Sequence, residues 1–213
     1  MTSSSTWRFR LEEVIARCRN QASSNAFWRE FTRFNDGTKP VEGAVGGAWM
    51  ADQRIHALAV MTDSDVFNTA TGRGAKTWTT GDVLEFFIQP DGSKSRYFEF
   101  HVTPSGAALS LRIDDASSLR ADCYRFDALL YESDFSFEYG RWEAGWWAHA
   151  DVSAEEIGLR DAEAARCCLC RYNYHHAWPK PELSSTAQLT GLTSFHHPEC
   201  WHSLTSDPPG LGD

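Results

Sequence analysis

Hydrophobic and polar positions alternate most clearly in two neighbouring segments, Asp82–Ile88 and Arg96–Thr103. In both segments every second residue is large and apolar. These residues are Leu84, Phe86 and Ile88 in the first segment, and Phe98, Phe100 and Val102 in the second. Because side chains alternate across a β-strand, each segment is predicted to be a strand whose apolar face packs on a core.

The opposite face of the same two strands is partly polar. It carries Glu85 in the first strand and Glu99 and His101 in the second, and Trp78 stands just upstream. Carboxyl and imidazole groups beside an aromatic ring suit a ligand that has hydroxyl groups at its edge and an apolar face. A sugar fits that description, so this face is a candidate binding surface.

Short apolar segments with turn signals between them recur along most of the chain. Asp91-Gly92 and Pro104-Ser105-Gly106 are the clearest turns. The pattern predicts an all-β, antiparallel sandwich or barrel with a few short helices. The predicted strands are Trp49–Met50, Arg54–Met61, Asp82–Ile88, Arg96–Thr103, Ala107–Ile113, Arg125–Tyr131, Phe135–Tyr139, Gly145–Val152 and Arg166–Tyr174.

The chain is predicted to hold one β-domain with less regular ends. Residues 1–44 are expected to form a helical or irregular wrap, residues 45–205 the β-domain and residues 206–213 a flexible tail. Within the wrap, residues 1–20 suggest a short helix. Phe27, Trp28, Phe31 and Phe34 fit either a helical face or an irregular segment around the domain.

Charge and hydropathy narrow the range of partners. The 213 residues carry a formal charge of −9, with a pI near 5.3, so nucleic acid and anionic membranes are not expected partners. No apolar stretch reaches the length of a membrane span. Nine tryptophans and thirteen phenylalanines exceed what a core needs and leave rings for a ligand platform.

The first 20 residues carry charges where a secretory signal would have its apolar segment. A cytoplasmic location is therefore expected, with secretion after removal of a signal as the alternative. The six cysteines are expected to be mostly reduced and partly buried, because a chain of this size needs no disulfide framework.

Two interpretations of the polar face stay open on the residues alone. Trp78 is either an edge-capping side chain or a ring that stacks on a sugar. Glu85 and His101 either form a surface ion pair or bind hydroxyl groups. The sequence contains no recognisable catalytic motif, so an enzyme is not supported. A hydrolase or isomerase that uses Glu85 and His101 as acid and base remains an alternative.

No metal site is predicted, and no cofactor is expected. Neighbouring histidines on a strand point to opposite faces, so the pairs His175-His176 and His196-His197 each offer one ligand at most. Asp63 and Asp65 could join a loop calcium site, and calcium as a structural ion stays open. Solvated acidic side chains are the expected state of these two residues.

Blocks of sequence in a consistent order resemble the family 9 carbohydrate-binding modules and their wider family 9-like relatives. The resemblance spans roughly residues 45 to 205. The blocks are Ala48–Ile55, Trp78 followed by Gly81–Ile88, Tyr97–Gly106, Trp146–Leu159, Glu182–Ser185 and Phe195–Trp201.

The resemblance implies a β-sandwich with a cleft that binds a mono- or oligosaccharide without catalysis. By position, Trp78 and Phe195 match two rings that clamp a glucose- or xylose-type sugar, and Glu85 matches a carboxylate that binds hydroxyl groups. His101 falls where such modules can carry an arginine, and Phe195 replaces the expected tryptophan. These four residues form the predicted carbohydrate site.

The same broad sandwich superfamily, of the DOMON type, includes haem-binding members. A haem or redox module is therefore a further alternative. His101, His149 and Met61 are the side chains that would supply its axial ligands.

Overall fold

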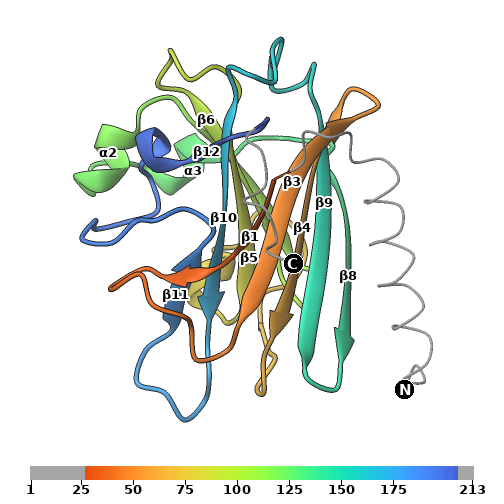
Figure 1. The fold of residues 1–213 in the computed structure, drawn as a ribbon, viewed down its shortest axis with the longest axis vertical. Coiled ribbons are helices and arrows are strands. Elements are labelled where there is room, and N and C mark those ends of the chain that lie inside the picture. The colour runs from red at the N-terminus through yellow and green to blue at the C-terminus, as the bar shows by residue number, and fades with distance from the viewer. Residues whose placement is uncertain (1–26, 206–213) are drawn as a thin grey trace, which may run out of the picture.

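The computed structural model describes residues 27–205 and shows two antiparallel β-sheets packed face to face (Figure 1). The first sheet consists of β1 (Phe27–Glu30), β3 (Ala44–Ala51), β4 (Arg54–Thr62), β9 (Gly145–Ser153) and β8 (Ser136–Trp142), in that order. The second consists of β2 (Thr32–Arg33), β11 (Glu182–Ser185), β10 (Arg166–Asn173), β5 (Val83–Gln89), β6 (Tyr97–Val102) and β7 (Ala108–Ile113), with β12 (His202–Ser203) beside β10. The predicted antiparallel sandwich is confirmed.

The apolar faces of the two sheets form the main core between them. Strands β5 and β6 place their large apolar residues there, as the alternation predicts. Strands β4 and β9 contribute from the opposite sheet. Burial of these side chains is the chief stabilising term of the fold.

A second apolar cluster covers the outer face of the second sheet. Short helices α2 (Ala116–Arg120) and α3 (Phe126–Leu129) and the segment that contains η2 (Pro198–Cys200) lie on the side of this sheet that is away from the first one (Figure 1). Every residue of β5 and β6 is consequently buried. The polar face of these strands is therefore enclosed, and a ligand reaches it only where the cover leaves a pocket.

The predicted strand over Arg125–Tyr131 is wrong, because most of this segment is helix α3. Phe126 and Leu129 are three residues apart and thus share one side of a helical turn. Both pack against the outer cluster on the second sheet. Tertiary packing therefore decides the backbone conformation of this short segment.

The residues Phe27 to Phe34 form strands and not the expected helical face or irregular wrap. Strand β1 pairs with β3, and β2 pairs with β11, so the chain crosses from one sheet to the other at Phe31. Phe27 and Phe31 fill the core between the sheets, and Phe34 joins the outer cluster. Strand pairing thus begins before residue 45. The expected helix in residues 1–20 and the expected tail at 206–213 lie outside the described residues.

Five of the six cysteines belong to the described residues, and none of these five forms a disulfide there. Cys167, Cys168 and Cys170 are buried on β10, whereas Cys123 and Cys200 are exposed. Within residues 27–205 no helix has the length and apolar character to cross a membrane.

Candidate functional site

A buried cluster of three titratable side chains lies on the outer face of β5 and β6. The strand register places Glu85 directly opposite His101. His101 Nε2 lies 2.5 Å from Glu99 Oε1 and 3.6 Å from Glu85 Oε1, and His101 Nδ1 lies 2.7 Å from the hydroxyl of Thr77. Glu85 is 3% exposed, Glu99 is 4% exposed and His101 is fully buried. Glu85 and His101 thus lie inside the protein, and the alternative of a surface ion pair is wrong.

The pKa values of the two carboxyl groups in this cluster are shifted in opposite directions. Burial, with the neighbouring charge of Glu99, raises the pKa of Glu85 well above its ordinary value. Burial also opposes ionisation of Glu99, but the adjacent imidazole of His101 outweighs it and lowers the pKa of Glu99. Glu85 is thus biased toward the neutral acid and Glu99 toward the carboxylate.

A pocket of about 280 Å³ opens above these acids. Its lining combines aromatic rings, acidic groups, aliphatic side chains and one imidazole. The lining residues are Trp78, Tyr124, Tyr172, Phe195, Glu85, Glu99, Asp122, Leu111, Leu119, Leu129, Ser194 and His196. The pocket is therefore built from strands of the second sheet and from the segments that cover it.

Trp78 is held at the pocket by a short turn, η1 (Thr77–Thr79). Its ring lies edge-on to two others, 5.6 Å from His101 and 5.7 Å from Phe126 between ring centroids. Its carbonyl accepts a hydrogen bond from the Tyr174 hydroxyl at 2.7 Å. These contacts fix the ring while leaving it partly exposed, as a stacking platform requires.

Phe195 lines the same pocket but is only 4% exposed. Its ring packs perpendicular to Phe34 and Tyr172, at centroid distances of 5.3 and 5.6 Å. Most of its surface is therefore committed to the outer cluster. The neighbouring Tyr172 is only partly buried and lines the pocket as well.

The structure brings Trp78, Glu85 and Phe195 to one pocket and places His101 beneath it. Sequence reasoning assigned no binding role to Tyr172, because its neighbour across the sheet was unknown. His196 appeared in the sequence only as half of a histidine pair. In the fold its Nδ1 lies 2.7 Å from the Tyr97 hydroxyl, and its ring lines the pocket.

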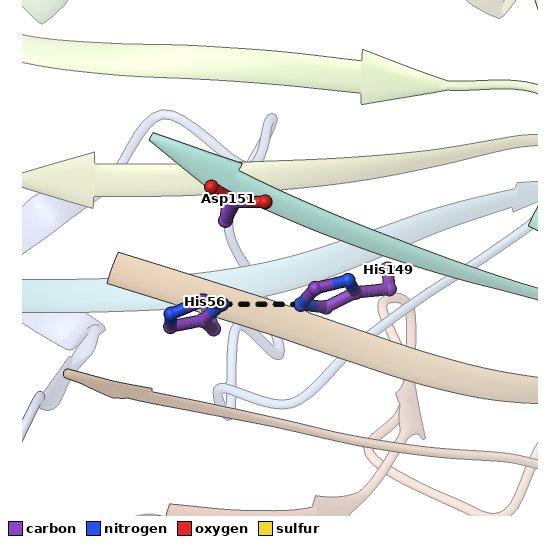
Figure 2. Close-up of side chains that lie close together, drawn as sticks. All are labelled: His56, His149 and Asp151. Atoms are coloured by element: carbon purple, nitrogen blue, oxygen red, sulfur yellow. Dashed lines mark hydrogen bonds between the residues drawn. The ribbon is translucent and has the colours of Figure 1, made fainter. Parts of the chain in front are cut away.

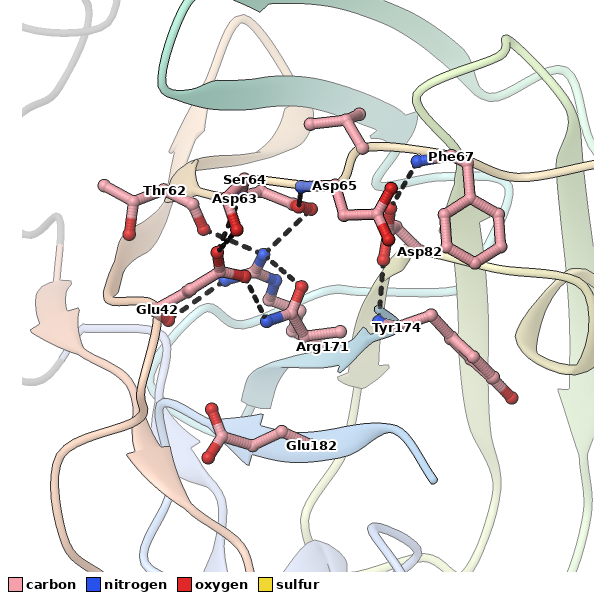
Figure 3. Close-up of polar contacts among 12 residues, drawn as sticks. Glu42, Thr62, Asp63, Ser64, Asp65, Phe67, Asp82, Arg171, Tyr174 and Glu182 are labelled. Carbon is pink, nitrogen blue, oxygen red and sulfur yellow. Dashed lines mark hydrogen bonds and ion pairs between the residues drawn. The ribbon is translucent and has the colours of Figure 1, made fainter. Parts of the chain in front are cut away.

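Asp63 and Asp65, the acids considered for calcium, have partners within the protein. Asp63 is 3% exposed, so the expectation of a solvated side chain is wrong for it. It pairs with the buried guanidinium of Arg171 at 3.2 Å (Figure 3). Asp65 accepts hydrogen bonds from the backbone and side chain of His176, at 2.6 and 2.8 Å. Three of their four carboxylate oxygens thus accept hydrogen bonds from the protein.

Arg171 holds together three segments that are distant in sequence. Its guanidinium donates to the carbonyl oxygens of Glu42 and Thr62 and to the side chain of Asn173, at 3.2, 2.9 and 2.6 Å (Figure 3). Asp82 lies nearby and accepts from the backbone amides of Phe67 and Tyr174, at 2.7 and 2.8 Å. Burial, with the charge of Asp63, raises the pKa of Asp82 to about 7.

The buried arginine and its acids anchor the ends of β4, β5 and β10. Asn68 fixes the neighbouring loop that leads to Trp78. Its side-chain amide donates to the carbonyls of Thr77 and Asp82, at 2.9 and 3.0 Å. This polar cluster supports the pocket without lining it.

A different cluster, His56, His149 and Asp151, lies on the outer face of the first sheet (Figure 2). Two imidazole nitrogens are 3.2 Å apart, and the rings are nearly parallel. The Asp151 carboxylate is bound by Arg54 and by the Ser136 hydroxyl. With its acid neutralised by an arginine, the cluster is explained by hydrogen bonding and ring stacking.

The three candidate haem ligands lie in three separate layers of the fold. His101 is on the outer side of the second sheet, Met61 is in the core between the sheets, and His149 is on the outer side of the first sheet. No two of these three side chains face a common space in the described part of the chain. The geometry therefore gives no support to a haem site built from them.

A hollow of about 980 Å³ elsewhere on the surface has a charged and polar lining without an aromatic ring. The pocket at Trp78 differs because aromatic and acidic groups converge in it. Apolar walls with a few placed polar groups are typical of small-molecule sites. We therefore take the pocket at Trp78 as the candidate functional site.

Comparison with solved structures identifies relatives of the fold. A protein from Bacteroides uniformis ATCC 8492, described as a candidate carbohydrate-binding protein, is 13% identical, with 89% of each chain covered and a TM-score of 0.65. Two structures of a family 9 carbohydrate-binding module from Caldicellulosiruptor kristjanssonii are each 11% identical. The complex with cellotriose covers 89% of this chain and 85% of that one, with a TM-score of 0.54. The complex with glucose covers 87% and 86%, with a TM-score of 0.52.

The chain has a family 9-like fold. This likeness agrees with the architecture expected from the sequence blocks around Trp78 and Phe195. No family model matches the sequence. No curated protein matches it either.

Proposed function

We propose that this protein binds sugars without catalysing a reaction, and that the pocket at Trp78 is its binding site. The observation that carries the proposal is the convergence of Trp78, Glu85 and Phe195. Trp78 and Glu85 are close in sequence and Phe195 is far along the chain, yet all three line a single pocket. The fold likeness to modules solved with cellotriose and glucose supports the same function.

The chemistry of the pocket suits a pyranose ring. The partly exposed ring of Trp78 can stack on the apolar C–H face of a sugar. Glu99 offers carboxylate oxygens to hydroxyl groups, and Glu85 as the neutral acid both donates and accepts. Tyr172 and Phe195 supply further apolar wall. His101 acts from below by holding Glu99 in place.

The size of the pocket favours a single sugar ring. Its volume of about 280 Å³ lies just below the usual range for small-molecule sites. We therefore infer that one terminal unit of a glucose- or xylose-type saccharide enters the pocket, and that further units extend outward.

Calorimetric titration with glucose, cellobiose, xylose and xylo-oligosaccharides tests the proposal. We expect binding of at least one of these sugars, and we expect Trp78→Ala to weaken it about tenfold or more, which corresponds to about 1.4 kcal/mol. Trp142→Ala, in the hairpin of β8 and β9 on the other sheet, is the matched control and should bind normally.

Absence of heat with every sugar, or equal binding by the wild type and Trp78→Ala, would contradict the proposal. Incubation with a panel of aryl glycosides addresses the alternative of an enzyme. Turnover that is lost in Glu85→Gln would replace the non-catalytic role with a catalytic one.

A further inference from the structure

The charges around the pocket are unevenly distributed. Glu85, Glu99 and Asp122 line it, and no lysine or arginine does so within the described residues. Two basic side chains of neighbouring segments have other partners. Lys76 Nζ lies 4.9 Å from the centroid of the Phe126 ring, and Arg120 donates to the carbonyl of His196 at 2.8 Å. Among residues 27–205, the basic groups beside these acids are thus the imidazoles of His101 and His196, with no lysine or arginine in the lining.

One oxygen of Glu99 lacks a hydrogen-bond donor within residues 27–205. Its Oε1 is bound to His101, but Oε2 is buried and unpaired there. The Nδ1 atom of His196 is 3.9 Å from this oxygen and lies beside the Tyr97 hydroxyl. A buried carboxylate oxygen without a donor is costly. Since Glu99 lines the pocket, a ligand that enters can supply the missing donor.

The walls around these acids are aromatic. Trp78, Tyr124, Tyr172 and Phe195 all contribute to the lining. Aromatic faces attract a cation placed over them, and a carboxylate forms its strongest hydrogen bonds with a charged donor. Rings and acids together thus match a ligand with an apolar body and a positive charge.

We propose that the pocket prefers a sugar that carries a protonated amino group, a hexosamine with a free amine, over the corresponding neutral sugar. The proposal rests on the sugar-binding function proposed above and names the class of sugar. The ammonium group binds between Glu99 and Glu85, while Trp78 contacts the sugar ring. Hydrogen bonding to Oε2 of Glu99 completes a group that has no donor among residues 27–205.

The experiment compares three sugars that share one ring and differ in a single substituent: glucose, glucosamine and N-acetylglucosamine. Calorimetry is carried out below about pH 7, where an amine of this kind is protonated. The dissociation constant of glucosamine should be at least tenfold lower than those of glucose and N-acetylglucosamine. Glu99→Gln removes the carboxylate with little change in shape. It should bring glucosamine close to the affinity of glucose, whereas the surface variant Glu155→Gln should behave as the wild type.

Each outcome decides a separate point. Equal affinity for glucose and glucosamine overturns the amine preference and leaves sugar binding intact. Tetramethylammonium that binds as tightly as glucosamine overturns the sugar function but supports a cation site. Manganese chloride alone, binding in a manner lost in Glu85→Gln, would assign the cluster of Glu85, Glu99 and His101 to a metal and overturn the proposal.

Discussion

At the scale of single residues, Glu85 shows how a strand can bury a carboxyl group at a cost that depends on pH. The side chain is 3% exposed and lies 3.6 Å from the imidazole of His101, which is itself engaged by Glu99. Burial raises the pKa of Glu85. Above the ordinary pKa of a glutamate, the folded state therefore keeps a proton that the unfolded chain has released.

This proton makes a testable contribution to stability. Because the folded state binds more protons than the unfolded one, Glu85 lowers the free energy of unfolding as the pH rises above about 4.5. The slope approaches about 1.4 kcal/mol per pH unit until the folded group ionises. We expect Glu85→Gln to lose this slope and to become more stable than the wild type at alkaline pH.

Urea unfolding of both proteins across the pH range provides the measurement. Their difference in free energy should grow with pH and be smallest below about pH 4.5. A difference that does not change with pH would show that the Glu85 carboxyl ionises as freely in the folded protein as in the unfolded chain.

At the scale of elements, the side chains of β10 alternate between the two faces of its sheet, and its inner face carries a buried arginine. Arg171 follows Cys167 and Leu169 on the side toward the first sheet, and Tyr172 faces the pocket on the other side. The guanidinium is fully buried, and burial lowers its pKa against the raising influence of Asp63. One strand thus contributes to the support of the loops and to the wall of the pocket.

Removal of the Arg171 charge should destabilise the fold strongly. We expect Arg171→Met to lower the free energy of unfolding by about 3–5 kcal/mol, because Asp63 is left buried without its partner. Arg166→Met, on the same strand but partly exposed, should cost about 1 kcal/mol or less.

Chemical denaturation of both variants gives the comparison, and Asp63→Asn added to Arg171→Met should recover part of the loss. If both single variants lose the same small amount, the buried ion pair is not a major anchor of β4 and β10.

The sequence predicts regular strands well and their covering poorly. Alternation in Asp82–Ile88 and Arg96–Thr103 identified both strands and which side chains face the core. It could not reveal that the second face is also buried, because that burial comes from α2, α3 and the segment near η2. Short elements such as β1 and α3 carry too few residues for a period to be recognised.

The candidate site was predictable only in part for the same reason. Trp78 and Glu85 stand near one another in sequence, whereas Tyr172 and His196 reach the pocket through pairings that no local pattern encodes. The family resemblance supplied Phe195, and the fold shows that this ring is mostly enclosed.

At the scale of the whole molecule, the pocket joins segments from much of the chain. Its lining extends from Trp78 in η1 to His196 near the last strand. A bound sugar would therefore stabilise contacts that span the second sheet and its cover. Ligand binding and global stability should be coupled.

We expect a sugar at about one hundred times its dissociation constant to raise the free energy of unfolding by about 2.7 kcal/mol. Tryptophan fluorescence and circular dichroism should report the same increase in the midpoint temperature of thermal unfolding, in a single transition. Trp78→Ala at the same sugar concentration should gain about half of this stabilisation or less. A shift in fluorescence alone would indicate that the ligand orders only the cover of the pocket.

The Arg171 guanidinium has a consequence for the environments in which this fold can operate. A bound metal ion dissociates when its free concentration falls. A charged side chain is covalently part of the protein and is present at every concentration. The ends of β4 and β10 are therefore joined by a charge that belongs to the chain itself. A chelator should leave this anchorage untouched, whether the protein meets abundant calcium or almost none.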